Sequence, residues 1–264
     1  MNRLKIKDIK KLKNKRPIVC LTSYTAGITK SIDKYVDLIL IGDSVGTAEY
    51  DMKNTRSVNL NIMKEHGRAV FKSSNHAFTS IDMPYGSYLN KKDALKNAKK
   101  LLKYTNCQSI KIETSSKELP IVSHLKKNNI TVISHIGVTP QSYKDFTKIK
   151  ILGRNMYERK KLLKLSMDLE KAGTDLIVLE CITSNLAREI TKKINIPTIG
   201  IGASDNCDGQ ILVINDLLGL ATFIKKPKFV KNYLNLSVLI KESVKKYASD
   251  VRNKKFPNKK FYYE

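Results

Sequence analysis

The sequence has no long apolar run and no paired cysteine motif. No apolar stretch approaches the roughly 18 residues of a membrane span, so we expect no membrane-spanning segment and no membrane partner. Residues 1–15 are basic without an apolar central region, which argues against a secretory signal. The four cysteines show no C-x-x-C spacing and fit a reduced compartment better than a disulfide framework. These absences predict a cytoplasmic protein.

Acidic residues are scarce relative to basic ones. The chain has 24 Asp and Glu residues against 49 Lys and Arg residues, a formal net charge of +25. Lysine dominates and occurs in nearly every predicted helix, whereas a nucleic-acid-binding protein gathers its basic residues on one face. The pattern favours a solvated basic surface that binds polyanions weakly and without specificity. A basic nucleic-acid-binding protein is the alternative from another functional class.

Neither a linker nor a low-complexity segment interrupts the 264 residues, which favours one domain over residues 1–264. Short apolar runs alternate with helical patterns, and the predicted strands are 17–23, 37–42, 77–82, 109–113, 131–134, 176–180, 198–202 and 211–214. Eight strand–helix alternations favour a closed (β/α)₈ TIM barrel. A doubly wound open sheet is the alternative, but no G-x-G-x-x-G follows the first strand.

Helical periodicity predicts the remaining elements. The helices are expected near 61–72, 90–104, 119–127 and 155–172, with a further one marked by Leu186, Ile190 and Ile194. Asn90 is a candidate N-cap, and Gly173 a candidate helix stop. We also predict an N-terminal helix over 1–16, a long C-terminal helix over 229–252 and a mobile tail over 253–264.

Polar residues end five successive predicted strands. They are Asp43, Asp82, Glu113, His135 and Glu180. Any one of them could cap a helix, but a barrel delivers the carboxyl ends of its strands to one rim, where barrels bind their ligands. Carboxylates gathered there raise one another's pKa unless a cation neutralises them. An all-oxygen ligand set favours Mg²⁺ over zinc.

Lys111 lies two residues before Glu113, so both side chains face the barrel interior. A lysine in that position needs an anionic ligand, such as a substrate carboxylate, or one of the rim acids as its partner. Gly42 and Gly46 flank Asp43 and Ser44, and glycines there let the backbone pass close to a ligand.

A collinear series of motifs resembles the ketopantoate hydroxymethyltransferase family. The motifs are IGDSVG (41–46), DMPYGSY (82–88), IKIE (110–113), HIGVTPQS (135–142), LEC (179–181), IPTIGIGAS (196–204) and DGQILV (208–213). HIGVTPQS and DGQILV are specific to the family, whereas GDS is shared with related keto-acid barrels. The resemblance covers the chain from residue 17 to about residue 236.

The resemblance implies an enzyme with a TIM-barrel fold of the phosphoenolpyruvate/pyruvate superfamily. Members transfer a hydroxymethyl group from 5,10-methylenetetrahydrofolate to 3-methyl-2-oxobutanoate through a Mg²⁺-stabilised enolate. The product, ketopantoate, serves pantothenate and coenzyme A biosynthesis. The partners implied are the small-molecule 2-oxo acid, the folate and further copies of the chain, because members form large homo-oligomers such as decamers; no specific nucleic acid is implied.

The motifs also imply roles for individual residues. By resemblance, the Mg²⁺ ligands are Asp43, Asp82 and Glu113, and the keto-acid-binding residues are Asp43, Ser44, Asp82 and Lys111. His135 resembles a histidine at the substrate-binding rim, and Glu180 in LEC resembles the general base.

Several rim loops depart from the family pattern. Thr25 stands where aspartate is usual, glycines are replaced at Thr114, Ser115 and Ser204, and residues 147–150 replace a glycine-rich segment. These departures bear on the geometry of the folate site. Two enzyme alternatives remain: another Mg²⁺-dependent 2-oxo-acid carbon–carbon lyase or mutase of the same superfamily, and a phosphate-binding barrel suggested by Gly200 and Gly202.

Overall fold

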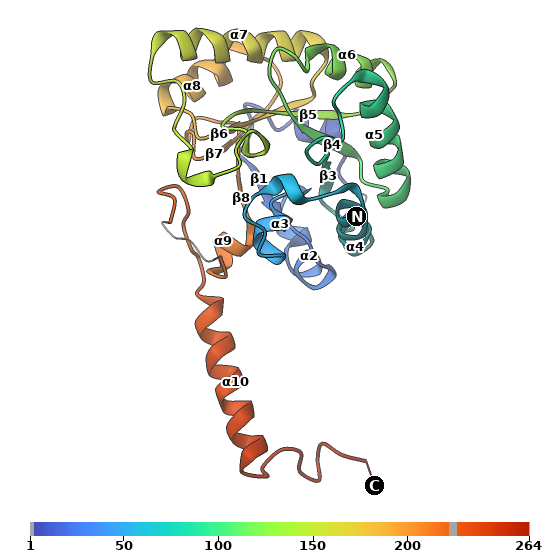
Figure 1. Cartoon of the computed structure of the whole chain (residues 1–264), viewed down its shortest axis with the longest axis vertical. Helices are drawn as coiled ribbons and strands as arrows, with labels where there is room; N and C mark the ends of the chain where they lie inside the picture. Colours follow the sequence, from blue (N-terminus) through green and yellow to red (C-terminus); the bar gives the residue numbers. More distant parts are fainter. Residues whose placement is uncertain (1–2, 222–225, 264) are drawn as a thin grey trace. The chain divides into compact units, whose positions relative to one another are not determined.

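The computed structural model describes residues 3–221 and 226–263. The chain divides into two compact units, Met1–Val213 and Ile214–Glu264. The first unit holds eight parallel strands that close into a barrel in chain order (Figure 1). The predicted fold class is therefore confirmed, whereas a single domain over residues 1–264 stays a prediction.

The strands of the barrel are short and almost completely buried. They are β1 (Ile18–Thr22), β2 (Leu38–Ile41), β3 (Phe78–Asp82), β4 (Ser109–Glu113), β5 (Val132–Gly137), β6 (Leu176–Glu180), β7 (Thr198–Ile201) and β8 (Gly209–Leu212). All residues of β2, β3 and β4 are buried, as expected for parallel strands covered by helices. β8 lies two residues before the predicted strand, because Gly209 pairs with Ile18 of β1 and closes the barrel.

Helices follow the strands on the outside of the barrel (Figure 1). They are α2 (Ala26–Ile32), α3 (Val45–Glu49), α4 (Leu60–Ser73), α5 (Lys91–Thr105), α6 (Leu119–Lys127), α7 (Met156–Ala172) and α8 (Ser184–Lys193). The end signals behave as predicted: the Asn90 side chain accepts a hydrogen bond from the Asp93 N–H, and Gly173 ends α7. Between β5 and α7 lie two short 3₁₀ helices, Pro140–Ser142 and Phe146–Lys148.

The N-terminal helix is shorter than predicted. α1 spans Ile6–Lys10 rather than residues 1–16, of which 1–2 lie outside the described residues. Turns follow α1, and Asn14 adopts a φ of +61°, which a right-handed helix does not accommodate. The predicted apolar face nevertheless exists, since Ile9 is fully buried in the barrel core and Leu4 and Leu12 pack against it.

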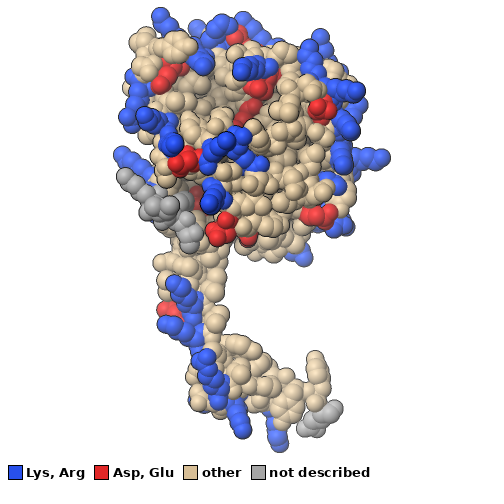
Figure 2. All heavy atoms as spheres, viewed as in Figure 1, with Lys and Arg blue, Asp and Glu red and all other residues tan. Residues whose placement is uncertain are grey.

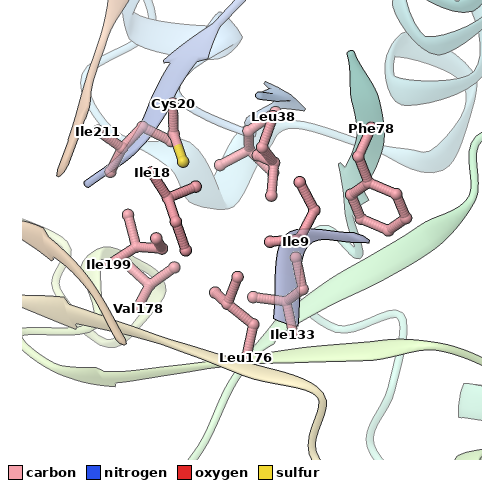
Figure 3. Packing of buried hydrophobic residues seen from close by; sticks show 11 residues of the cluster. Ile9, Ile18, Cys20, Leu38, Phe78, Ile133, Leu176, Val178, Ile199 and Ile211 are labelled. Atoms are coloured by element: carbon pink, nitrogen blue, oxygen red, sulfur yellow. The ribbon is translucent and has the colours of Figure 1, made fainter. Parts of the chain in front are cut away.

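The barrel core is a cluster of aliphatic side chains from α1 and the strands. In Figure 3, Ile9 of α1 points toward Leu38, Ile133 and Leu176, which come from three different strands. This apolar plug excludes water from the interior at the level of α1. Polar interior residues such as Lys111 and Glu113 therefore belong to the opposite, carboxyl-terminal part of the barrel.

The second unit contains α9 (Ile214–Leu218) and the long helix α10 (Leu236–Arg252). α10 begins later than the predicted residue 229, because the N–H groups of Tyr233 and Leu234 bond back to the Leu217 carbonyl instead of continuing a helix. The Tyr247 and Phe256 rings lie 5.6 Å apart, so the residues after α10 fold back on it. The mobility of 253–264 stays a prediction.

Basic side chains are dispersed. On the face that Figure 2 presents, Lys and Arg residues are distributed over the barrel unit with Asp and Glu residues between them. Within the two described stretches of chain, none of the helices combines the length and the apolar character that crossing a bilayer requires.

Candidate active site

The carboxyl ends of five consecutive strands assemble the predicted residues at one rim of the barrel. Asp43 and Ser44 follow β2, and the four other elements contribute Asp82 (β3), Lys111 and Glu113 (β4), His135 (β5) and Glu180 (β6). Parallel register places Asp82 beside Lys111 and Glu113 beside His135 in neighbouring strands. Period-2 alternation then points these side chains inward, as the sequence predicted.

Asp43, Asp82 and Lys111 form a connected buried group. Asp82 Oδ2 accepts a hydrogen bond from the Asp43 N–H at 3.0 Å, and Asp82 Oδ1 lies 3.0 Å from Lys111 Nζ. A Cβ at Gly42 would lie 2.7 Å from Ser44 Oγ and 3.7 Å from Asp82 Oδ2. The glycine is therefore explained by close approach of the chain to this group. The Ser44 hydroxyl is itself held by the Tyr24 hydroxyl at 2.7 Å.

His135 lies between two acids. Its Nε2 is 3.1 Å from Glu180 Oε2, and its Nδ1 is 3.8 Å from Glu113 Oε1. His135 is buried, whereas 19% of the Glu180 side chain is exposed. Neither ring nitrogen has a well-aligned hydrogen bond within the described residues. Of the two acids beside His135, Glu180 is therefore the more exposed to solvent.

Gln141, which the sequence analysis did not single out, joins the acids. Its Nε2 donates to Asp43 Oδ2 at 2.7 Å, and its backbone N–H lies 3.1 Å from both carboxylate oxygens of Glu113. Its Oε1 accepts from the Tyr88 hydroxyl at 2.6 Å. The available signal was its position in HIGVTPQS, six residues beyond the rim histidine His135.

Burial and like charge set the protonation of this group. Burial, followed by repulsion from Asp82, raises the pKa of Asp43 to about 7. Burial and the neighbouring Asp43 also raise the pKa of Glu113 well above its usual value. Burial alone would lower the pKa of Lys111, but Asp82, Asp43 and Glu113 outweigh it, so Lys111 stays charged. The site therefore holds more carboxylates than a single lysine neutralises.

Burial, with a smaller contribution from Lys111, lowers the pKa of His135. The imidazole is consequently neutral at pH 7, and one ring nitrogen carries a proton while the other is an acceptor. A neutral imidazole next to Glu180 can orient that carboxylate without neutralising its negative charge.

The donor chemistry of the rim fits Mg²⁺. Mg²⁺ binds through one or two carboxylates, with water and substrate oxygens completing its octahedron. Asp43 and Asp82 supply buried oxygens with a deficit of positive charge. Across residues 3–221 and 226–263, no three His, Cys, Asp or Glu side chains converge tightly enough to enclose a metal ion. The assignment of Asp43, Asp82 and Glu113 as Mg²⁺ ligands stays a prediction.

A cavity of about 270 Å³ adjoins the acids. Its lining includes Arg56, Tyr85, Tyr88, Glu113, Glu118 and Gln141. The Arg56 guanidinium lies 3.8 Å over the Tyr85 ring and donates to the Tyr85 hydroxyl at 2.6 Å, so it covers one face of that partly exposed ring.

The residues that depart from the family pattern form hydrogen bonds with nearby groups. Thr25 caps α2, since its hydroxyl accepts from the Ile28 N–H at 3.5 Å, a role that aspartate also fills. Thr114 Oγ1 donates to the His135 carbonyl, and Ser115 donates to Glu118. The Ser204 hydroxyl lies 2.9 Å from that of Ser184. Of these, Thr114 and Ser115 line the cavity.

The cysteines are unsuited to nucleophilic catalysis. All four are free thiols. Burial, followed by the charge of Glu180, raises the pKa of Cys181 to about 12, and burial raises the pKa of Cys20 still further. Neither is a thiolate at neutral pH, so neither is suited to act as a nucleophile.

Comparison with known proteins identifies the family. A sequence model described as ketopantoate hydroxymethyltransferase matches residues 3–259. The chain is 45% identical to the 3-methyl-2-oxobutanoate hydroxymethyltransferase of Pelagibacter ubique (strain HTCC1062) over 263 residues, 100% of both chains. The chain belongs to the ketopantoate hydroxymethyltransferase family. The resemblance found in the motifs is thereby confirmed, and the chain is an enzyme of a transferase family.

Other members of the family have similar sequence identity to this chain. The enzyme of the same name from Campylobacter concisus (strain 13826) is 40% identical over 262 residues, covering 99% of this chain and 96% of that one. The Helicobacter pylori (strain ATCC 700392 / 26695) protein is 40% identical over 258 residues, covering 98% and 95%. Family membership favours the hydroxymethyltransferase interpretation over the nucleic-acid-binding alternative.

Solved structures share the fold at low sequence identity. A phosphonopyruvate hydrolase in complex with oxalate and Mg²⁺ matches with a TM-score of 0.63 and 11% identity, covering 96% of this chain and 88% of that one. The 2,3-dimethylmalate lyase, described as a PEP mutase/isocitrate lyase superfamily member, matches with a TM-score of 0.59 and 11% identity, covering 97% and 91%. At this identity the likeness concerns the barrel alone.

Proposed function

We propose that this protein transfers a hydroxymethyl group from 5,10-methylenetetrahydrofolate to 3-methyl-2-oxobutanoate and forms ketopantoate. The observation that carries the proposal is the pairing of reachable Glu180 with neutral His135 beside the buried group of Asp43, Asp82 and Lys111. A base next to a site that attracts a cation and a carboxylate suits proton removal from carbon beside a carbonyl. Family membership supplies the reaction that such a site would serve.

The keto acid would be held by charge and by hydrogen bonds. Lys111 stays protonated, and its ammonium group would bind the substrate carboxylate. Ser44, which follows β2 at the same rim, would donate a hydrogen bond to the keto acid. Asp43, Asp82 and the neighbouring Glu113 are the residues that would hold Mg²⁺. When bound, Mg²⁺ supplies Lewis acidity that stabilises negative charge developing on the keto oxygen.

Glu180 is the general base of this proposal. Its carboxylate removes the proton from C3 of the keto acid, and the electron pair of that bond moves toward the carbonyl. His135 Nε2 lies 3.1 Å from Glu180 Oε2, close enough to orient the carboxylate once the two groups align around bound substrate. C3 then bonds to the methylene carbon of the donor as one of its two C–N bonds breaks, and the oxygen of a water molecule bonds to that carbon as the second C–N bond breaks. The two released nitrogens of tetrahydrofolate take up the proton removed from C3 and one proton of the water.

The cavity beside Glu113 is the proposed place for the folate. The guanidinium of Arg56 and the Tyr85 ring, which is 44% exposed, are groups on which an aromatic ring system can stack. Thr114 and Ser115, which replace the family's glycines, line this cavity. They would therefore affect folate binding more than the chemistry at the keto acid. The proposed setting is the cytoplasm, where the four free thiols remain reduced.

A homo-oligomer is also part of the proposal. α10 presents six exposed apolar side chains, Val238, Leu239, Ile240, Val244, Tyr247 and Val251, each 42–57% exposed. Four of them, Ile240, Val244, Tyr247 and Val251, share one helix face at i, i+4, i+7 and i+11, and an exposed apolar stripe of this kind is typical of a protein–protein contact. Light scattering that reports a monomer at micromolar concentration would contradict this part of the proposal.

Product analysis tests the function directly. We expect ketopantoate from 3-methyl-2-oxobutanoate and 5,10-methylenetetrahydrofolate when Mg²⁺ is present, and loss of product after chelation. The Asp82→Asn variant, which removes a proposed ligand, should lose both activity and keto-acid affinity. Normal turnover after exhaustive chelation would overturn the metal assignment. Cleavage of a 2-oxo acid without any folate-dependent product would favour the lyase alternative.

A further inference from the structure

Gln141 occupies a buried position at the centre of the rim, and the reaction described above gives it no task. It is 4% exposed and lies in the short 3₁₀ helix that follows β5. Its side chain and backbone contact five residues, Asp43, Glu113, Met83, Tyr88 and Arg56. These come from four segments of the chain, because Met83 and Tyr88 share the connection between β3 and α5.

The hydrogen bonds fix the orientation of the Gln141 amide. Nε2 donates to two acceptors, Asp43 Oδ2 at 2.7 Å and the Met83 carbonyl at 3.1 Å. Oε1 accepts from the Tyr88 hydroxyl at 2.6 Å. A rotation of the amide by 180° would set its oxygen against a carboxylate and a carbonyl, so one orientation alone satisfies all partners.

The contact with Asp43 has a consequence for cation binding. An amide N–H orients an ionised carboxylate through a charge-assisted hydrogen bond but leaves its negative charge intact. A lysine or arginine in the same place would compete with a cation for Asp43. Because the bond occupies Oδ2, Oδ1 is the oxygen left to face a metal ion.

The same residue also orients the neighbouring acid. The backbone N–H of Gln141 lies 3.1 Å from both carboxylate oxygens of Glu113, and the Gln141 carbonyl accepts from Arg56 Nη1 at 3.0 Å. A side-chain substitution leaves these backbone contacts in place. Of the two acids, only Asp43 therefore loses its hydrogen bond to Gln141, while the Met83 carbonyl and the Tyr88 hydroxyl lose theirs as well.

We infer that Gln141 is a positioning residue that holds the Asp43 carboxylate in the orientation for binding a divalent cation, with Tyr88 fixing the Gln141 amide. The inference rests on the metal site of the proposed function. Removal of a group that orients a metal ligand typically lowers metal affinity by about 10–100-fold. The effect should appear in metal binding to the substrate-free protein, before any turnover.

The test is titration of the full-length, metal-free protein with Mn²⁺ as the probe, by calorimetry. Gln141→Leu keeps the size of the side chain and removes both polar ends, and we expect the Kd for Mn²⁺ to rise about 10–100-fold. Tyr88→Phe keeps the aromatic ring but removes the hydroxyl that donates to Gln141 Oε1. Loss of that hydrogen bond should raise the Kd for Mn²⁺ about 2–10-fold. Gln210→Leu, whose amide bonds the Ser204 carbonyl from an exposed position on β8, is the matched control and should bind as the native protein does.

A thermal melt of each metal-free variant separates positioning from packing. Positioning predicts a weakened Kd in a variant that melts as a folded protein, together with a raised KM for the keto acid. An unchanged Kd in folded Gln141→Leu, with saturable binding to the native protein, would overturn this inference alone. If Gln141→Leu does not fold, Tyr88→Phe decides, and an unchanged Kd there overturns it. Absence of saturable Mn²⁺ binding to the native protein would overturn both this inference and the proposed metal site.

Discussion

At the scale of single residues, the geometry of Glu180 depends on a glycine in the neighbouring strand. Gly137 ends β5 with a φ of +98°, and a Cβ built there would lie 2.2 Å from the Glu180 carbonyl oxygen. A backbone carbonyl in a strand cannot move aside as the end of a flexible side chain can. Any larger residue must therefore push the end of β6, and with it the proposed base, away from its place.

The substitution Gly137→Ala tests this dependence. We expect a loss of about 1–3 kcal/mol in the free energy of unfolding, from the left-handed φ and the overlap with β6. Activity should fall by at least about 10-fold, because a base displaced by a fraction of an ångström loses its alignment. Urea denaturation and initial-rate assays measure the two effects.

Gly27→Ala is the matched control. Gly27 lies in α2, and a Cβ there meets no atom within 4 Å. Replacing a helical glycine with alanine should stabilise the protein by up to about 1 kcal/mol and leave activity unchanged. A Gly137→Ala enzyme as active and as stable as this control would contradict the assignment of Gly137.

The sequence was sufficient to predict the rim residues but not the contacts between them. Period 2 and strand ends placed Asp82, Lys111 and Glu113 on one inward face, because those rules act within a single strand. The role of Gln141 could not be predicted, because it depends on a contact with Asp43, which lies 98 residues away in the chain. Patterns within a short stretch of sequence carry no information about such a long-range contact.

At the scale of elements, a single aspartate orders the connection between α4 and β3. The Asp33 carboxylate accepts hydrogen bonds from the Ser74 hydroxyl at 2.6 Å and from the N–H groups of Asn75, His76 and Ala77 at 2.6–3.0 Å. Burial alone would raise the pKa of Asp33, but these hydrogen bonds outweigh it and hold the pKa below its usual value.

Asp33→Asn should therefore cost stability in a pH-dependent way. At pH 7 we expect the free energy of unfolding to fall by about 1.5–3 kcal/mol, the range for a hydrogen bond to a charged group. Because the folded-state pKa of Asp33 is lowered, its contribution is present above the usual pKa of about 3.9 and is lost as the pH falls through the lowered value. The difference between native and variant protein should shrink between pH 5 and pH 3. Urea unfolding with the same difference across that range would contradict this account.

Element boundaries followed local signals where those signals were strong. Asn90 and Gly173 marked helix ends that the structure confirms. The N-terminal and C-terminal helices were predicted too long, because a lysine-rich run with scattered apolar residues has helical periodicity without fixing where the helix ends. A local turn with Asn14 at positive φ follows α1, whereas backbone bonds from Tyr233 and Leu234 to Leu217, about 16 residues earlier in the chain, precede α10.

At the scale of the whole molecule, the charge of +25 is a property of a dispersed surface (Figure 2). Non-specific electrostatic binding to DNA falls steeply with salt, since each phosphate contact releases a counterion. We expect weak binding of mixed-sequence DNA at low salt, with no sequence preference, that is lost near physiological ionic strength. Fluorescence anisotropy across a salt series measures it, and sequence-selective nanomolar binding at physiological salt would contradict the interpretation.

The proton at C3 of the keto acid gives the most direct test of the account, because its removal requires the keto-acid site and the base but no folate. In D₂O with Mg²⁺ and without folate, native protein should exchange the C3 proton of 3-methyl-2-oxobutanoate, as followed by NMR. Glu180→Gln should still bind the keto acid but exchange about 10²–10⁴-fold more slowly, the usual effect of losing a general base. Exchange at the native rate in Glu180→Gln would contradict the assignment of Glu180 as the base.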